Sequence, residues 1–108
     1  MPTKVEMYDE AVALQQEGKV EEAVGKLNDL IAQDPDYALA HAALSKFNSL
    51  LEKHDAAVES AKKVCELEPN DPFSFVAMSM ICQKADRMAE AEQAMEKARS
   101  AADQIPPA

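Results

Sequence analysis

The sequence predicts an all-α fold in which helices pair into hairpins. Of its 51 hydrophobic residues, 20 are alanine, the strongest helix former, whereas the β-branched and aromatic residues that favour sheets are few. The chain also repeats itself, because Ala23, Ala57 and Ala91 lie 34 residues apart, as do Pro35 and Pro69. Within each period the apolar residues recur at helical spacing. These three observations predict six helices in three antiparallel hairpins.

The first period, about residues 4–35, contains two apolar stripes. One stripe begins at Val5 and reaches Leu14, and the other begins at Val20 and reaches Ile31. Spacings of three and four residues place each stripe on one face of a helix. Gly18 lies between the stripes and therefore predicts the turn.

The second period, about residues 36–69, predicts helices over roughly 37–51 and 55–67. Asp36 and Asp55 are placed to cap the N-termini of these helices, since an aspartate side chain accepts hydrogen bonds from the first free amides. Glu68 and Pro69 are expected to stop the second helix, because a residue before proline disfavours the helical conformation.

The third period, about residues 70–103, opens on Asp71 and Pro72. This pair is typical of a cap followed by proline at the first helical position, and it predicts a helix to about Lys84. Asp86 is expected to open the last helix, which should run to about Ala102. A short proline-rich tail, 104–108, then completes a single domain over residues 1–108.

Over about residues 4–103 this pattern resembles the tetratricopeptide repeat family. Small residues occupy the family's glycine position in the first helices (Ala11, Ser45, Ser79), and alanine holds the fixed position in the second helices. The chain departs from the family pattern at Glu10, where leucine is expected, and at His41 and Asn48, where aromatic residues are expected. The resemblance implies a right-handed α-solenoid whose first helices line a concave groove.

The family's groove-lining positions are mostly apolar in this chain. A contiguous apolar patch on a soluble protein often marks a partner site, so the resemblance implies binding of an extended peptide or amphipathic helix. Alternatively, the first-turn residues pack against neighbouring helices. Lys46 could pair with a ligand carboxylate or remain a solvated charge. The groove set is Val5, Tyr8, Val12, Leu39, Ala42, Lys46, Phe73, Val76 and Met80.

One subclass of the family grips the terminal carboxylate of chaperones through lysine, arginine and asparagine side chains. The matching positions here are Tyr8, Val12, Ala43, Phe73 and Ala77. None can donate a hydrogen bond to a carboxylate except, weakly, the tyrosine hydroxyl. A co-chaperone role of the Hsp70 or Hsp90 type is therefore disfavoured.

Charge and motifs exclude several classes of function. With 20 acidic and 11 basic residues the net charge is −9, which repels nucleic acid and anionic membranes. No secretory signal or long apolar run is present, so we expect a cytoplasmic protein. His41 and His54 belong to no catalytic motif, and His41 is expected to be a packed imidazole. We therefore expect no enzyme activity, no cofactor and no metal.

Two cysteines, Cys65 and Cys82, lack the spacing of a metal or redox motif. They are expected to be small buried hydrophobes. The alternative is a disulfide or redox-sensing pair, because sequence does not give the distance between them.

Two functions remain. The favoured one is a protein–protein interaction adaptor or scaffold, and the alternative is a self-associating structural subunit that uses its terminal hairpin or its groove. A homodimer through Met88 and Met95 is one form of the alternative. The acidic residues of the first hairpin are expected to be a solvated face or, alternatively, a rim that steers a basic partner. They are Glu17, Glu21, Glu22 and Asp29.

Overall fold

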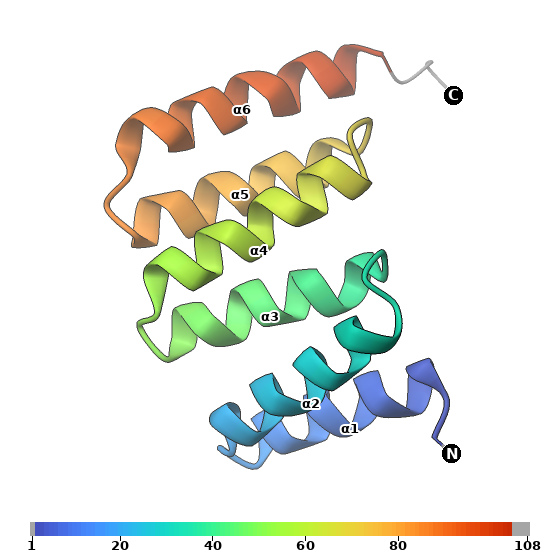
Figure 1. Ribbon diagram of the computed structural model, residues 1–108. Coiled ribbons are helices and arrows are strands. Elements are labelled where there is room, and N and C mark those ends of the chain that lie inside the picture. The colour runs from blue at the N-terminus through green and yellow to red at the C-terminus, as the bar shows by residue number, and fades with distance from the viewer. Residues whose placement is uncertain (1, 105–108) are drawn as a thin grey trace.

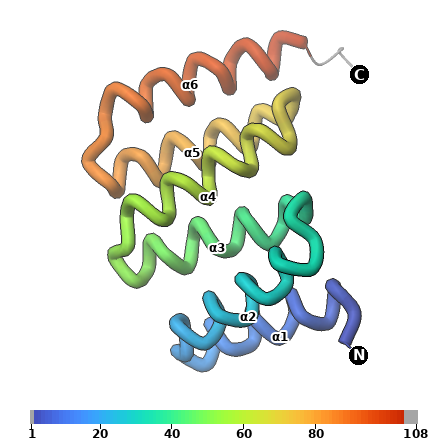
Figure 2. The backbone as a smooth tube through the Cα atoms, in the orientation of Figure 1, coloured from blue at the N-terminus to red at the C-terminus, as the bar shows by residue number. Residues whose placement is uncertain are grey.

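The computed structural model describes residues 2–104, and these residues form six α-helices (Figures 1 and 2). Apart from residue 104, the predicted tail lies outside the described residues. The all-α prediction is confirmed for the described residues, and the boundaries differ from the expected ones by a few residues. The helices are α1 (Lys4–Gln16), α2 (Val20–Gln33), α3 (Ala38–Leu50), α4 (His54–Leu67), α5 (Pro72–Lys84) and α6 (Met88–Asp103).

The helices form three antiparallel hairpins that stack in chain order (Figure 1). Each hairpin contacts the next mainly through its second helix, so that α2 packs on α3 and α4 packs on α5. The first helices α3 and α5 also meet directly. The stack measures 41 × 32 × 22 Å, the elongated shape expected when each unit contacts only its neighbours.

The same tight turn closes all three hairpins. Gly18 has a φ of +83°, which confirms the predicted turn, and Glu52 and Asp86 have φ values of +60° and +61°. These three residues lie 34 residues apart. In each turn the amide after the left-handed residue donates to the carbonyl five residues back, which satisfies a free carbonyl at the helix end. The bonds join Lys19 to Leu14 (2.9 Å), Lys53 to Asn48 (2.9 Å) and Arg87 to Cys82 (2.8 Å).

Three of the predicted N-caps are wrong, and the turn within the hairpins explains two of them, Asp55 and Asp86. Asp86 lies in the turn itself, two residues before α6 begins. Asp55 lies inside the first turn of α4, because that helix begins at His54, two residues after the left-handed Glu52, and its carboxylate pairs with Arg87 instead. Asp36 precedes the cap position of α3, and its own amide donates to Asp34 Oδ1 at 3.2 Å.

The predicted start of α5 and end of α4 are confirmed. Asp71 Oδ1 accepts a hydrogen bond from the Phe73 amide at 3.0 Å, and Pro72 occupies the first helical position. Helix α4 ends at Leu67, directly before Glu68 and Pro69. These two signals act within a few residues of the chain, which is why the sequence is sufficient to place them.

The repeated small residues are buried between the helices. Ala11, Ser45 and Ser79 are all buried, and so are the alanines of the second helices at 23, 57 and 91. Ser45 Oγ also donates to the Ala57 carbonyl at 2.8 Å across the second hairpin. These positions are thus buried, as close packing of the helices requires.

The buried hydrophobic side chains form two clusters of different composition. The first joins α1, α2 and α3 and contains the large side chains of Leu27, Leu30 and Phe47. The second joins α4, α5 and α6 and includes Val58 and Met78 together with three alanines. Because buried area sets most of the hydrophobic stabilisation, the third hairpin is held by the weaker core.

Candidate binding site

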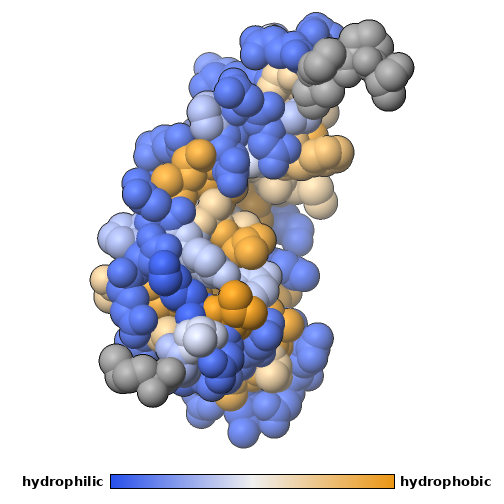
Figure 3. Space-filling view, turned by 90° about the vertical axis from the view of Figure 1, so that its right-hand side faces the viewer, coloured by the Kyte–Doolittle hydropathy of each residue, from blue (hydrophilic) through white to orange (hydrophobic). Residues whose placement is uncertain are grey.

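Three large apolar side chains are exposed at equivalent positions of the three first helices. Val5, Leu39 and Phe73 lie in the first turns of α1, α3 and α5, and their exposed fractions are 60%, 56% and 77%. The exposure of Leu39 and Phe73 contradicts the alternative that these two side chains pack against neighbouring helices. Figure 3 shows hydrophobic patches spread along the curved stack among hydrophilic side chains.

The other predicted groove residues differ in how much they are exposed. Met80 is 56% exposed, and Ala42 and Lys46 are also exposed. Val12 and Val76 are partly buried. Tyr8 is partly buried against the first core cluster, so the packing alternative is correct for this residue.

Sequence reasoning missed Leu50, which is 50% exposed at the end of α3. Leu50 follows Lys46 by four residues and Leu39 by eleven, so these side chains share one face of the helix. The helical spacing was the available signal, but the family's groove positions do not include position 50.

A hollow of about 310 Å³ lies between the second and third hairpins. It brings together three residues of the predicted groove, Ala42, Lys46 and Met80, with residues that were not predicted. The other six predicted residues do not line it. The unpredicted lining includes Ala61 and Val64 of α4 together with Ile81 and Lys84 of α5.

The charges around this hollow are positive only. Lys46 and Lys84 line it, no carboxylate does, and neither lysine forms an ion pair with any residue in the described part of the chain. By contrast, Lys62 lies within 4.0 Å of two glutamates. The hollow is therefore an apolar site with two available ammonium groups.

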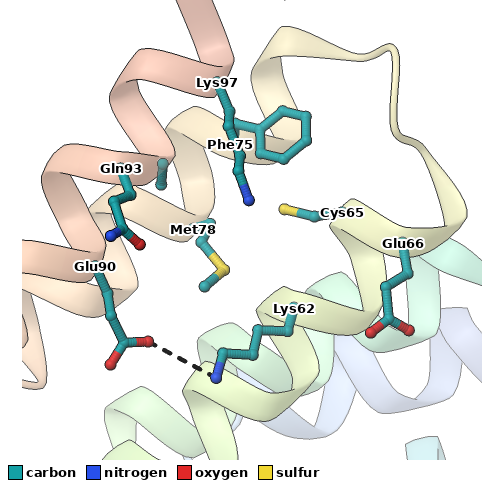
Figure 4. A pocket seen from close by; sticks show the side chains of 9 residues that line it. Lys62, Cys65, Glu66, Phe75, Met78, Glu90, Gln93 and Lys97 are labelled. Atoms are coloured by element: carbon teal, nitrogen blue, oxygen red, sulfur yellow. Dashed lines mark ion pairs between the residues drawn. The ribbon is translucent and has the colours of Figure 1, made fainter.

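A second hollow, of about 670 Å³, opens between α4 and α6 over α5 (Figure 4). Lys62 bridges it by an ion pair of 3.7 Å to Glu90. Figure 4 shows Phe75, Cys65 and the Lys97 side chain on its other side. Its charges are mixed, with two lysines and two glutamates, so they select no single ligand charge.

The cysteines differ from each other in burial, and both thiols are free. Cys82 is fully buried, as predicted, whereas Cys65 is only half-buried and faces the second hollow. Burial raises the pKa of the Cys65 thiol to about 11 and also raises the pKa of Cys82. Because the thiolate is the reactive form, both residues are weak nucleophiles at neutral pH.

A third hollow, of about 480 Å³, lies on α5 and α6 and is lined by Met88 and Met95. Met88 is 55% exposed. Ser79 lies at the base of this hollow, and its buried hydroxyl oxygen has no hydrogen-bond partner among the described residues. This is the surface that the homodimer alternative requires.

The remaining titratable groups give no sign of a reactive centre. His41 is buried and its Nε2 lies 2.7 Å from the Pro35 carbonyl oxygen, which confirms the packed imidazole. Within residues 2–104, no cluster of three or more histidine, cysteine or acidic side chains could hold a metal. None of the described helices is long and apolar enough to span a membrane. The arrangement is suited to binding.

A family model described as the tetratricopeptide repeat matches residues 38–71, which contain α3, α4 and the turn between them. Residues 38–71 therefore resemble one tetratricopeptide repeat. The matched span has the length of the 34-residue period seen in the three left-handed turn residues, Gly18, Glu52 and Asp86. No curated protein sequence matches the chain.

Solved structures show the same fold. A chain of the CopN-Scc3 complex matches with a TM-score of 0.85 at 17% identity, over 95% of this chain and 61% of that one. The type III secretion translocator chaperone SycD of Yersinia enterocolitica matches with a TM-score of 0.83 at 20% identity, over 96% of this chain and 79% of that one. The second tetratricopeptide repeat domain of Spaghetti, bound to an HSP90 peptide, matches with a TM-score of 0.79 at 21% identity, over 90% of both chains. This chain thus spans about three fifths of its counterpart from the CopN-Scc3 complex.

Proposed function

We propose that this chain is a tetratricopeptide repeat protein and a non-catalytic adaptor, which binds an extended peptide or amphipathic helix across α1, α3 and α5. The observation that carries the proposal is the exposure of Val5, Leu39 and Phe73 at equivalent positions of three successive helices. Burying one large apolar side chain contributes about 1.5–3 kcal/mol. Three such contacts along one partner segment are enough to offset part of the cost of association.

The solved neighbours support binding to proteins. Spaghetti is bound to a peptide, and another neighbour belongs to a two-component complex. The ligand of this chain differs from a terminal chaperone carboxylate, because the resemblance puts Phe73, which is 77% exposed, where that subclass has a lysine. We therefore propose an apolar partner segment in place of an acidic chain terminus.

The charge of the chain supports a protein partner over other classes of ligand. A net charge of −9 disfavours nucleic acid and anionic membranes. The acidic residues of the first hairpin, such as Glu21 and Asp29, are exposed as predicted. We propose that the adaptor works in the cytoplasm without a cofactor.

A random dodecapeptide library displayed on phage tests the adaptor proposal. We expect peptides with apolar residues to be selected on the wild-type protein and to lose at least tenfold in affinity on the variant Leu39→Glu/Phe73→Glu. Both positions are exposed, so the variant should fold, which circular dichroism can check. Met88→Glu is the matched control, since Met88 is equally exposed on a different helix. Selected peptides that bind the two variants equally well would contradict the proposal.

A second candidate function is self-association through α6. It is supported by the exposure of Met88 and by the hollow that Met88 and Met95 line. Light scattering over a concentration series should then detect a dimer that Met88→Glu abolishes. A monomer at every concentration would overturn this candidate and leave the adaptor proposal unchanged.

A further inference from the structure

Four positions that line the hollow between the second and third hairpins carry smaller side chains than the same positions one repeat earlier. Three of the larger counterparts in the preceding repeat are no more than 3% exposed, so they fill their site. The smaller side chains leave a volume of about 310 Å³, at the small end of ligand pockets. The four pairs of equivalent positions, each 34 residues apart, are Tyr8 and Ala42, Leu27 and Ala61, Leu30 and Val64, and Phe47 and Ile81.

The same comparison shows where the positive charges of the hollow come from. Lys46 stands where the first repeat has Val12, and Lys84 stands where the second repeat has Leu50. Each lysine thus replaces an apolar residue at the edge of the groove. Both ammonium groups line an apolar wall with no carboxylate beside them, although acidic residues outnumber basic ones in the chain. A ligand carboxylate would supply the missing counter-charge.

We infer that this hollow, flanked by Lys46 and Lys84, is a specificity pocket for one large apolar side chain of the partner that lies next to a glutamate or aspartate. The inference rests on the proposed adaptor function and deepens it. The apolar side chain fills the space left by Ala42 and Ala61, and the acidic neighbour reaches the lysines. The two lysines lie outside the five positions that correspond to the terminal-carboxylate clamp, and the proposal assigns the carboxylate to a side chain within the bound segment.

Two blocked tripeptides provide the probe: acetyl-Glu-Leu-Ala-amide and its glutamine analogue. The methyl groups of Ala42, Ala61 and Ala77 line the hollow and report binding in spectra of ¹³C-methyl alanine-labelled protein. We expect their shifts to give a dissociation constant of roughly 5–80 mM for the glutamate peptide, since burying one side chain contributes about 1.5–3 kcal/mol. The glutamine peptide should bind about threefold more weakly. Sodium acetate alone, as a simple anion, should produce no saturable shift.

Variants test separately the contribution of the two lysine charges and the contribution of the open volume of the hollow. Lys46→Gln/Lys84→Gln should remove the preference for glutamate, whereas Lys19→Gln/Lys53→Gln, which changes the net charge equally outside the hollow, should keep it. Ala42→Tyr restores the side chain of the first repeat and should weaken both peptides at least tenfold. Because Ala42 is exposed, this variant should fold, and Ala61→Leu provides a second way to fill the space. Ala89→Tyr, on the exposed surface of α6, is the control for added bulk.

Three results would overturn the pocket. They are equal affinity for the two tripeptides, a glutamate preference that survives Lys46→Gln/Lys84→Gln, and shifts that saturate with acetate alone. Any of these results leaves the adaptor proposal standing if the phage-selected peptides still require Leu39 and Phe73. Conversely, selected peptides that ignore Leu39 and Phe73 contradict the adaptor proposal even when the tripeptides behave as expected.

Discussion

Replacing Glu52 with glycine should stabilise the protein. Glu52 has a φ of +60° in the turn between α3 and α4, a conformation that a side chain disfavours. Gly18 holds the equivalent place in the first hairpin with a φ of +83°. The Glu52 side chain is exposed and forms no ion pair with the described residues, so its removal sacrifices no contact of that kind.

The size of the effect follows from two opposing terms. A left-handed conformation costs a residue with a Cβ atom about 1–2 kcal/mol. Glycine in turn costs about 0.5–1 kcal/mol, because the unfolded chain gains conformational freedom. The net gain in the free energy of unfolding should be about 0.5–1 kcal/mol, which corresponds to roughly 2–8 °C in melting temperature for a domain of this size.

Urea denaturation followed by circular dichroism measures this difference. Glu52→Ala is the control, since it removes the same side chain but keeps the Cβ atom, and it should not stabilise. Gly18→Ala should destabilise by about 1 kcal/mol. A Cβ atom added at Gly18 meets no atom within 4 Å, so the loss there comes from the backbone alone. If Glu52→Gly proves no more stable than Glu52→Ala, backbone strain in this turn is not what limits stability.

Two further predictions concern a cap and a thiol. Asp71→Ala should lower the free energy of unfolding, measured in urea, by about 1 kcal/mol, because the Phe73 amide loses its hydrogen-bond acceptor. The control Asp36→Ala should change it by less than about 0.5 kcal/mol, and equal losses in the two variants would contradict the cap assignment. In a Cys82→Ala variant, the reaction of Cys65 with Ellman's reagent should still accelerate from pH 8 toward its pKa of about 11, and a plateau near pH 9 would refute the burial effect. Folding raises the pKa of this thiol from about 9 in the unfolded chain to about 11. The contribution of the thiol to the free energy of unfolding is therefore complete below pH 9 and is lost as the pH rises to about 11.

The fold could be predicted because its signals are local and repeated. Apolar spacing gave the helices, and Gly18 and Pro72 gave a turn and a helix start that the structure confirms. The caps at Asp36 and Asp55 could not be predicted from residue type alone. The start of α4 is set by the left-handed residue before it, and a glutamate at position 52 gives no sign of such a turn except through its register with Gly18.

The candidate site could be predicted only in part. The exposed positions of Leu39 and Phe73 follow from the repeat, since every first helix presents the same face. Tyr8 differs from its counterpart Ala42 because a large side chain at that position reaches the core of the first hairpin. The hollow also depends on Ala61 and Val64 of α4, a second helix, and a rule based on the first helices alone does not include them.

The differences between repeats are more informative about function than the features they share. A buried leucine replaced by alanine typically costs a protein about 2–5 kcal/mol, so Ala61 in the place of Leu27 leaves the second interface with less stabilisation than the first. A chain whose last hairpin is already held by the smaller core cluster gains nothing in folding from that choice. It gains an open site with two lysines at its edge, where a partner can supply both the missing apolar contact and the missing charge. Binding at this site would therefore also strengthen the contact between the second and third hairpins.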